Sequence, residues 1–159
     1  MITLVLGGAR SGKSALAERM AASLGAEVVY VATAEVYDDD FAARVAAHRA
    51  RRPATWRTVE AGADLPSTVR DLTSGRPLLV DSLGTWVARC ADFAADGDAL
   101  VAALDGRDAV VVSEEVGLGV HPETEVGRRF RDALGEINQV VAQAADRVLL
   151  VVAGRTVEL

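Results

Sequence analysis

Residues 2–14 read ITLVLGGARSGKS and carry the pattern that decides the fold. Positions 2–6 are mostly apolar and typical of a buried strand, and an alanine-rich segment of helical character begins at Lys13. Between them, positions 7–14 match G-x-x-x-x-G-K-[ST], the Walker A pattern. A strand, a glycine-rich turn and a helix in this order form the context in which the pattern folds into a phosphate-binding loop.

The residue types in this segment suit a phosphate group. Glycines let the backbone turn tightly enough for consecutive N–H groups to point inward, and a helix N-terminus adds the positive end of its dipole. Lys13 is expected to neutralise the β- and γ-phosphates of a nucleotide, and the Ser14 hydroxyl to ligate Mg²⁺. The chain has 17 basic residues, and Lys13 is its only lysine. Arginine and lysine are not interchangeable where a point charge must fit between phosphates, so this placement supports the interpretation.

Apolar runs alternate with alanine-rich stretches along the rest of the chain. Expected strands lie at 2–6, 27–32, 56–60, 77–81, 108–113 and 147–152, and expected helices at 13–24, 39–51, 65–72, 83–91 and 124–145. Nearly continuous apolar strands in this alternation predict an α/β P-loop NTPase fold (RecA-like), a doubly wound and mostly parallel sheet flanked by helices. Residues 156–159 are a candidate antiparallel edge strand, and 93–98 are the expected surface loop. We expect one domain spanning 1–159.

Acidic residues that end apolar runs are candidates for the metal-binding partner of the loop. Asp81 follows Leu78-Leu79-Val80, and Glu114 and Glu115 follow the run at 110–113. Ligands bind outside the carboxyl ends of strands in open α/β sheets. We favour Asp81 for this role, and leave open which of Glu114 and Glu115 takes part.

The composition limits the classes of partner. A net charge of −6 argues against a nucleic-acid binder, because such a chain would not neutralise a run of phosphates. One cysteine, Cys90, excludes an internal disulfide, and we find neither a signal-peptide pattern nor an apolar run long enough to span a membrane. The expected location is the cytoplasm.

The segment 38–52, DDDFAARVAAHRARR, predicts a helix with a basic face that includes a histidine. Arg44, His48 and Arg51 or Arg52 recur at helical spacing, and neighbouring arginines favour the neutral, nucleophilic form of His48. Acids first and arginines last also match the helix dipole, so stability alone explains part of the pattern. The other histidine, His121, is expected on the surface.

Several segments resemble one family of enzymes. They are LGGARSGKS at 6–14, YVATAE at 30–35, DDDFAARVAAHRARRPATWRTVE at 38–60, LLVDSLGTW at 78–86 and VVVSEEVGLGVHPETEVGRRFRDALGEINQVVAQAADRVLLVVAG at 110–154. The chain is identified on these segments as a member of the bifunctional adenosylcobinamide kinase / adenosylcobinamide-phosphate guanylyltransferase family of cobalamin biosynthesis.

The resemblance implies two reactions. ATP or GTP would phosphorylate adenosylcobinamide, and GMP would then pass from GTP to adenosylcobinamide phosphate through a covalent guanylyl-histidine. The family histidine falls on His48, with Lys13 as the second catalytic residue. Ser14 and Asp81 would hold Mg²⁺, with Glu115 as a further candidate, and the assembly would be a trimer. The implied nucleotide contacts are Gly8, Ala9, Arg10, Ser11, Gly12, Lys13, Ser14, Thr33, Ala34, Glu35, Arg49, Ala50, Arg51, Arg52, Glu60 and Asp81.

The chain departs from the family pattern in two places. Glu114 stands where the family commonly has asparagine, which adds a negative charge near the expected phosphates. Residues 87–107 form a shorter segment than the family leads us to expect, which leaves acceptor preference and assembly open.

Two other functions share the loop. A regulatory GTPase would explain Asp81-Ser82-Leu83-Gly84 as D-x-x-G, but the N-K-x-D motif that reads guanine needs a second lysine. A simple P-loop small-molecule kinase, with a structural His48, is the nearer alternative.

Overall fold

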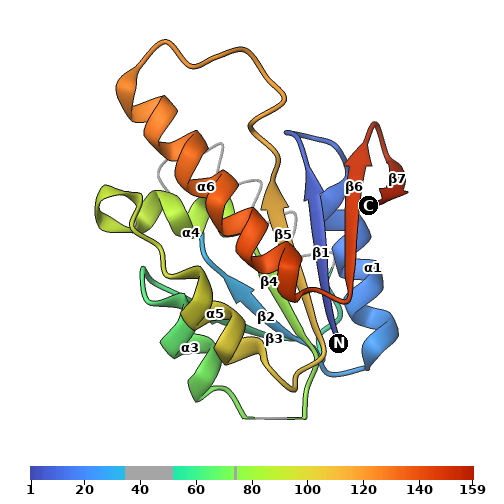
Figure 1. The fold of residues 1–159 in the computed structure, drawn as a ribbon. Helices are drawn as coiled ribbons and strands as arrows, with labels where there is room; N and C mark the ends of the chain where they lie inside the picture. Colours follow the sequence, from blue (N-terminus) through green and yellow to red (C-terminus); the bar gives the residue numbers. More distant parts are fainter. Residues whose placement is uncertain (35–51, 74) are drawn as a thin grey trace.

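The computed structural model describes residues 1–34, 52–73 and 75–159 of the chain. Its strands are β1 (Ile2–Gly7), β2 (Val29–Ala32), β3 (Arg57–Glu60), β4 (Leu78–Asp81), β5 (Ala109–Glu114), β6 (Arg147–Val152) and β7 (Arg155–Glu158). They form one sheet in the order β3-β2-β4-β5-β1-β6-β7, shown in Figure 1. Only the β6–β7 pair is antiparallel within this sheet. The predicted mostly parallel sheet with an antiparallel C-terminal edge strand is confirmed.

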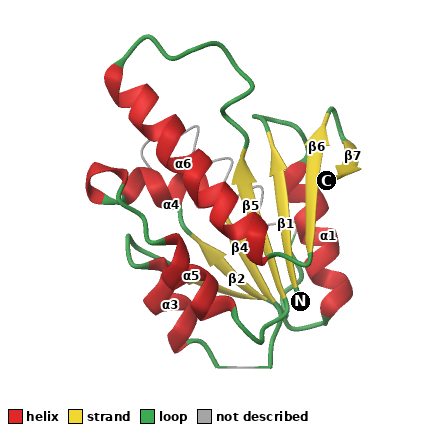
Figure 2. Cartoon of the chain, in the orientation of Figure 1, coloured by secondary structure: helices red, strands yellow, loops and turns green. Residues whose placement is uncertain are grey.

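Helices cover both faces of the sheet, as Figure 2 shows. They are α1 (Lys13–Leu24), α3 (Leu65–Asp71), α4 (Leu83–Arg89), the short 3₁₀ helix η1 (Ala91–Phe93), α5 (Gly97–Leu104) and α6 (Glu125–Ala144). Side chains alternate across a strand, so Leu4 of β1 packs with the α3–α6 side and Val5 packs with α1. The two apolar layers therefore share the central strands.

The central strands and α6 have the patterns that burial requires. The three apolar residues of β4 are fully buried, as expected for a strand covered on both faces. On α6 the buried positions are Leu134, Ile137, Asn138 and Val141, the spacing of one helix face. Complete burial of one leucine contributes about 1.5–3 kcal/mol relative to exposure, so these layers supply most of the driving force for folding.

Two expectations from the sequence were wrong. The strand β3 is largely exposed rather than buried on both faces, because it lies at one edge of the sheet, whereas β7 is the exposed edge strand that the sequence suggested. The expected loop at 93–98 is only partly a loop. Phe93 ends η1 and packs edge-on against Phe130, with ring centroids 5.6 Å apart, and Gly97 begins the unpredicted helix α5. The expected helix at 39–51 lies outside the described residues.

The sheet brings the ends of three parallel strands to one edge. Gly7 of β1 pairs with Glu114 of β5, and Asp81 of β4 pairs with Val112 of the same strand. Asp81 and Glu114 therefore lie at the carboxyl ends of neighbouring strands, where the loop after β1 also begins.

Among the described helices, none is long and apolar enough to cross a membrane.

Candidate functional site

The loop between β1 and α1 has the compact backbone that the glycine pattern predicts. The Ser11 amide donates to the Gly8 carbonyl oxygen at 3.3 Å, and Arg10 and Gly12 have φ of 55° and 97°. A Cβ on Gly7 would lie 2.5 Å from Ser11 Oγ and 2.7 Å from the Val151 carbonyl oxygen. The loop therefore closes tightly against β6, and only glycine fits at position 7.

The loop is also held from the C-terminal side of the chain. The Gly154 amide, in the turn between β6 and β7, donates to the Ser11 carbonyl oxygen at 2.9 Å. Side chain atoms on Gly12 would meet the Gly154 Cα at 3.6 Å, an ordinary contact distance. Backbone contacts therefore support this flank of the loop.

The N-terminus of α1 differs from those of the other described α-helices. Side chains cap α3, α4, α5 and α6, by accepting from an amide in the first turn; the caps are Asp64, Ser82, Asp96 and Thr124. The residue before α1 is Gly12, which has no side chain, and the first turn of α1 contains no acidic residue. The Lys13 amide donates to Ser11 Oγ at 3.4 Å, a long bond within the loop itself. The first amides of a helix need partners, and this arrangement leaves the amides that follow Lys13 to an anion.

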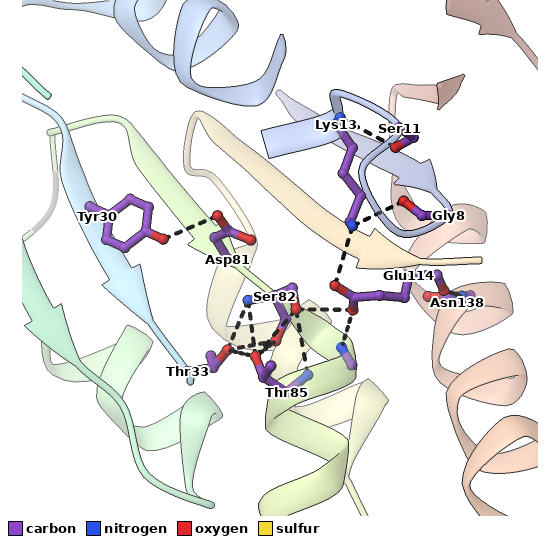
Figure 3. A network of polar contacts seen from close by, with 11 residues as sticks. Gly8, Ser11, Lys13, Tyr30, Thr33, Asp81, Ser82, Thr85, Glu114 and Asn138 are labelled. Carbon is purple, nitrogen blue, oxygen red and sulfur yellow. Dashed lines mark hydrogen bonds and ion pairs between the residues drawn. The ribbon is translucent and has the colours of Figure 1, made fainter. Parts of the chain in front are cut away.

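Lys13 lies in the first turn of α1 and is directed back over the loop, as Figure 3 shows. Its Nζ lies 3.4 Å from the Gly8 carbonyl oxygen and 3.5 Å from Glu114 Oε1. The side chain is only 11% exposed. A positive charge is thus held at the mouth of the loop, beside the uncapped helix.

The carboxylate of Glu114 reaches from β5 to the start of α4. Its Oε2 accepts from Ser82 Oγ at 3.0 Å and from the Gly84 amide at 3.1 Å. A Cβ on Gly84 would collide with the same oxygen. The Glu114 carbonyl oxygen accepts from Asn138 Nδ2 of α6 at 3.1 Å. Glu114 therefore joins the phosphate loop to two helices.

Thr33, fully buried after β2, fixes the backbone of Ser82. Its Oγ1 donates to the Ser82 carbonyl oxygen at 2.6 Å and accepts from the Ser82 amide at 2.8 Å. Thr85 completes a capping box with Ser82. Arg89 donates to the carbonyl oxygens of Thr33 and Ala61 at 3.4 and 3.1 Å. This network sets where α4 begins relative to Glu114.

Asp81 ends β4, one residue before this network. Its Oδ2 accepts from the Tyr30 hydroxyl at 3.1 Å. Burial and, after it, the negative charge of Asp81 raise the pKa of Tyr30 far above its ordinary value, so the hydroxyl stays protonated and donates. The carboxylate is thereby oriented by a neutral donor from β2.

Arg52 packs between Tyr30 of β2 and Glu18 of α1. Its guanidinium carbon lies 3.2 Å from the centre of the Tyr30 ring, and its Nε lies 3.5 Å from Glu18 Oε1. The side chain is 8% exposed. A cation stacked on a buried ring and paired with a carboxylate is firmly placed, so a contact between Arg52 and a nucleotide would require it to leave this position.

The remaining candidates divide into three groups. Ser14 is half-buried in the first turn of α1, and Ala9 and Arg10 are exposed on the loop. Glu60 is exposed at the end of the edge strand β3, with three strands between it and β1, and Ala34 follows β2. Residues Glu35, His48, Arg49, Ala50 and Arg51 lie outside the described residues.

The two neighbouring glutamates have different surroundings. Glu115 donates its amide to the Gly7 carbonyl oxygen at 3.2 Å, and its Oε1 accepts from the Gly117 amide at 2.7 Å. Its carboxylate therefore engages its own loop, whereas that of Glu114 faces Lys13. His121 is exposed, as expected, with Nδ1 2.8 Å from Arg131 Nη1.

Comparison with known proteins identifies the family. Residues 3–159 match the model of the family described as cobinamide kinase / cobinamide phosphate guanyltransferase, CobU. The chain belongs to this family.

Curated relatives support this assignment over the whole chain. The bifunctional adenosylcobalamin biosynthesis protein CobP of Pseudomonas aeruginosa is 46% identical, with 97% of this chain and 94% of that protein covered. The proteins named CobU from Escherichia coli and Salmonella typhimurium are each 37% identical, with 100% of this chain and 99% of theirs covered. The alignment with the Escherichia coli protein runs over 181 positions against 159 residues here, so that CobU is longer.

Solved structures add only a distant likeness. The P4 protein of bacteriophage phi6 in complex with ADP matches with a TM-score of 0.48 at 15% identity, over 98% of this chain and 52% of that chain. Similarity of this degree says nothing about function.

The oxygen donors in the described part of the site are of the type that Mg²⁺ binds. In residues 1–34, 52–73 and 75–159, no group of three or more His, Cys, Asp or Glu side chains is placed to hold a metal by itself. Mg²⁺ is bound through one or two carboxylates together with substrate phosphates and water, all of them oxygen donors. Ser14, in the first turn of α1, and Asp81, at the end of β4, carry oxygen donors of this type.

Several residues of the network were not singled out from the sequence as site residues. Ser82, Gly84 and Thr85 follow directly after Asp81, and Ser-x-x-Thr before an apolar run is a variant of the signature of a capped helix. Tyr30 gave no such signal, since an aromatic residue in a buried strand is normally a core residue. Its role depends on the pairing of β2 with β4, which places Ala32 opposite Asp81.

Proposed function

We propose that this protein phosphorylates adenosylcobinamide with ATP or GTP and then transfers GMP from GTP to the product, giving adenosylcobinamide-GDP and pyrophosphate. The observation that carries the proposal is the uncapped start of α1 with Lys13 folded over the loop, in a chain whose whole length matches the family. An intact phosphate-binding geometry is what both reactions need.

In the kinase step, the protein mainly positions and stabilises charge. The amides of residues 8–14 would bind the phosphates, and Lys13 would neutralise charge that develops on the transferred phosphoryl group. When bound through Ser14 and Asp81, Mg²⁺ supplies Lewis-acid stabilisation of the phosphate oxygens. Tyr30 would keep the Asp81 carboxylate oriented for this role, and Glu115 is a further candidate ligand.

In the transfer step, the nucleophile would be His48. A ring nitrogen attacks the α-phosphorus of GTP, the bond to the bridging oxygen breaks, and pyrophosphate leaves with that electron pair. An oxygen of adenosylcobinamide phosphate then attacks the same phosphorus, and the P–N bond breaks to regenerate His48. Arg52 would join the proposed nucleotide contacts only by leaving Tyr30 and Glu18. The other proposed contacts are Thr33, Ala34, Glu35, Arg49, Ala50, Arg51 and Glu60.

We further propose that both reactions use one domain, residues 1–159, and that the protein assembles as a trimer in the cytoplasm. The continuous sheet supports the single domain, and the family resemblance supports the trimer. Size-exclusion chromatography with light scattering measures the assembly directly.

Covalent labelling tests the proposal. The protein is incubated with Mg²⁺ and GTP labelled at the α-phosphate, denatured, and assayed for retained label, with His48→Ala in parallel. We expect label on the wild-type protein that is acid-labile and alkali-stable, and none on the variant. Binding of GTP without any retained label would refute guanylyl transfer through histidine and would leave a P-loop kinase.

A further inference from the structure

The contacts of Glu114 set it apart from the other acidic residues at this edge of the sheet. It is the last residue of β5, directly beside the last residue of β1, and its carboxylate is only 29% exposed. One oxygen lies near the Lys13 ammonium, and the other accepts from the Ser82 hydroxyl and the Gly84 amide. Figure 3 shows the carboxylate between the loop and α4.

This position makes Glu114 a rival of the phosphate groups for Lys13. The ammonium that the loop offers to a nucleotide lies 3.5 Å from Glu114 Oε1. The carboxylate is tied to α4 on its other side, and the missing Cβ of Gly84 provides the space it occupies. It is thus held in place rather than free to turn away as phosphates arrive.

The electrostatic consequence depends on the charge of the arriving ligand. A metal-free nucleoside diphosphate carries several negative charges, and these would share one ammonium with a fixed carboxylate at short range. Like charges in a partly buried site repel by enough to change a binding constant by about tenfold or more. A bound divalent cation removes most of that charge and therefore most of the repulsion.

We propose that Glu114 makes the phosphate loop select the Mg²⁺ complex of a nucleotide over the metal-free nucleotide. Glu114 is a specificity-determining residue in this account, and it acts on charge rather than on the reacting atoms. The proposal rests on the proposed function only in taking a nucleoside phosphate as the ligand of the loop.

Binding of GDP, which cannot donate a guanylyl group with loss of pyrophosphate, tests the proposal by calorimetry. We compare the wild-type protein with Glu114→Gln, whose amide oxygen can still accept from Ser82 and Gly84, in EDTA and in excess Mg²⁺. We expect Glu114→Gln to bind GDP about tenfold more tightly in EDTA, and about twofold more tightly in Mg²⁺. A change that only loosened the site would weaken binding, so the sign distinguishes the two explanations.

Two further variants complete the experiment. Glu136→Gln changes the net charge equally at an exposed position of α6 and is expected to bind as the wild type does. Glu114→Ala removes the carboxylate without adding an amide, and tests the same point if Glu114→Gln does not fold. Thermal unfolding checks that each variant is folded.

The outcomes separate this inference from the proposed function. Equal or weaker GDP binding in EDTA by folded Glu114→Gln and Glu114→Ala would overturn the role of Glu114 alone. A similar gain in Glu136→Gln would also overturn it, because net charge would then suffice. Absence of GDP binding by the wild-type protein, with and without Mg²⁺, would overturn the nucleotide-binding function itself.

Discussion

Two helices, α1 and α4, begin at the carboxyl ends of the parallel strands and face the same polar network. Their first turns differ in whether side chains cap them. The start of α1 has a glycine in place of a cap, no acidic residue, and a lysine. The start of α4 has the Ser82–Thr85 capping box, and the carboxylate of Glu114 accepts from its Gly84 amide. The protein has therefore filled one helix start from its own side chains and left the other to a ligand.

The contrast explains how an anion is directed to one place. Both helix starts carry a partial positive charge, and either would attract phosphate if its amides were free. Ser82 and Glu114 accept from the Thr85 and Gly84 amides of α4, whereas no capping side chain accepts from the first turn of α1. Substitutions at the start of α1 should therefore mainly weaken nucleotide binding, and substitutions at the start of α4 should mainly lower stability.

The largest effect should come from removing the charge at the open helix start. We expect Lys13→Ala to weaken GDP binding in Mg²⁺, and to lower kinase turnover, by about a hundredfold or more. Lys13→Arg should recover little of this loss, because a planar guanidinium does not replace a compact ammonium between phosphates. Arg19→Ala, on an exposed position of the same helix, is the control, and wild-type binding by Lys13→Ala would contradict the assignment.

The next largest effect is expected on stability, from a substitution of Gly84 at the start of α4. Alanine normally stabilises a helix relative to glycine by about 1 kcal/mol, but at position 84 its Cβ would collide with Glu114 Oε2. We expect Gly84→Ala to lower the free energy of unfolding by about 1–3 kcal/mol. Gly135→Ala in α6, where a Cβ meets nothing within 4 Å, should instead raise it by about 0.5–1 kcal/mol. Urea denaturation of both variants measures the difference, and equal signs would show that the collision is relieved cheaply.

A smaller effect is expected from the cap itself. Ser82→Ala removes the acceptor for the Thr85 amide and a donor to Glu114, for a loss of about 1–2 kcal/mol in unfolding free energy. Asp96→Ala removes the cap of α5, away from the loop, and should lose about 1 kcal/mol. Only Ser82→Ala should also change GDP affinity, because only Ser82 contacts Glu114. Identical affinities in the two variants would separate the cap from the site.

The smallest effect is expected from Tyr30, whose hydroxyl donates to Asp81, the residue before the Ser82 cap. The raised pKa of Tyr30 means that its protonated hydroxyl contributes stability that is complete below the unfolded value of 10.0 and is lost as the pH rises above it. Tyr30→Phe should lower stability near pH 7 by about 1 kcal/mol, through the lost hydrogen bond to Asp81. Above pH 10 its unfolding free energy should fall less steeply than that of the wild type. Parallel curves for the two proteins would indicate that the hydroxyl titrates normally.

The sequence predicted those parts of the structure in which a residue type is required by its neighbours in sequence. It failed where the requirement comes from an element far away in the chain. The strand, loop and helix at 2–14 could be predicted because each position obeys a rule of its own segment. The helix α5 could not, although Asp96 is a usable cap, because it begins with glycine. A Cβ on Gly97 would lie 3.1 Å from atoms of both Ile137 and Val140 on α6, so that glycine is explained by a helix forty residues away.

The same limit applies to the site. The sequence singled out Asp81, Glu114 and Glu115 as carboxylates at strand ends but could not rank the two glutamates. The structure shows that only Glu114 approaches Lys13, because successive residues leave a strand in opposite directions. Thr33 was named through the family resemblance, but its bonds to Ser82 depend on the pairing of strands that are far apart in sequence.

The presence of a single lysine has a practical consequence for chemical labelling. Beyond the N-terminal amine, a reagent for primary amines meets one target in this protein, and that target lies at the mouth of the phosphate loop. Slow acylation at Lys13, and protection from it by a nucleotide, would give a mass-spectrometric readout of site occupancy on the unmodified sequence. For the same reason, coupling the protein to a surface through its amines risks attaching it by the residue on which phosphate binding depends.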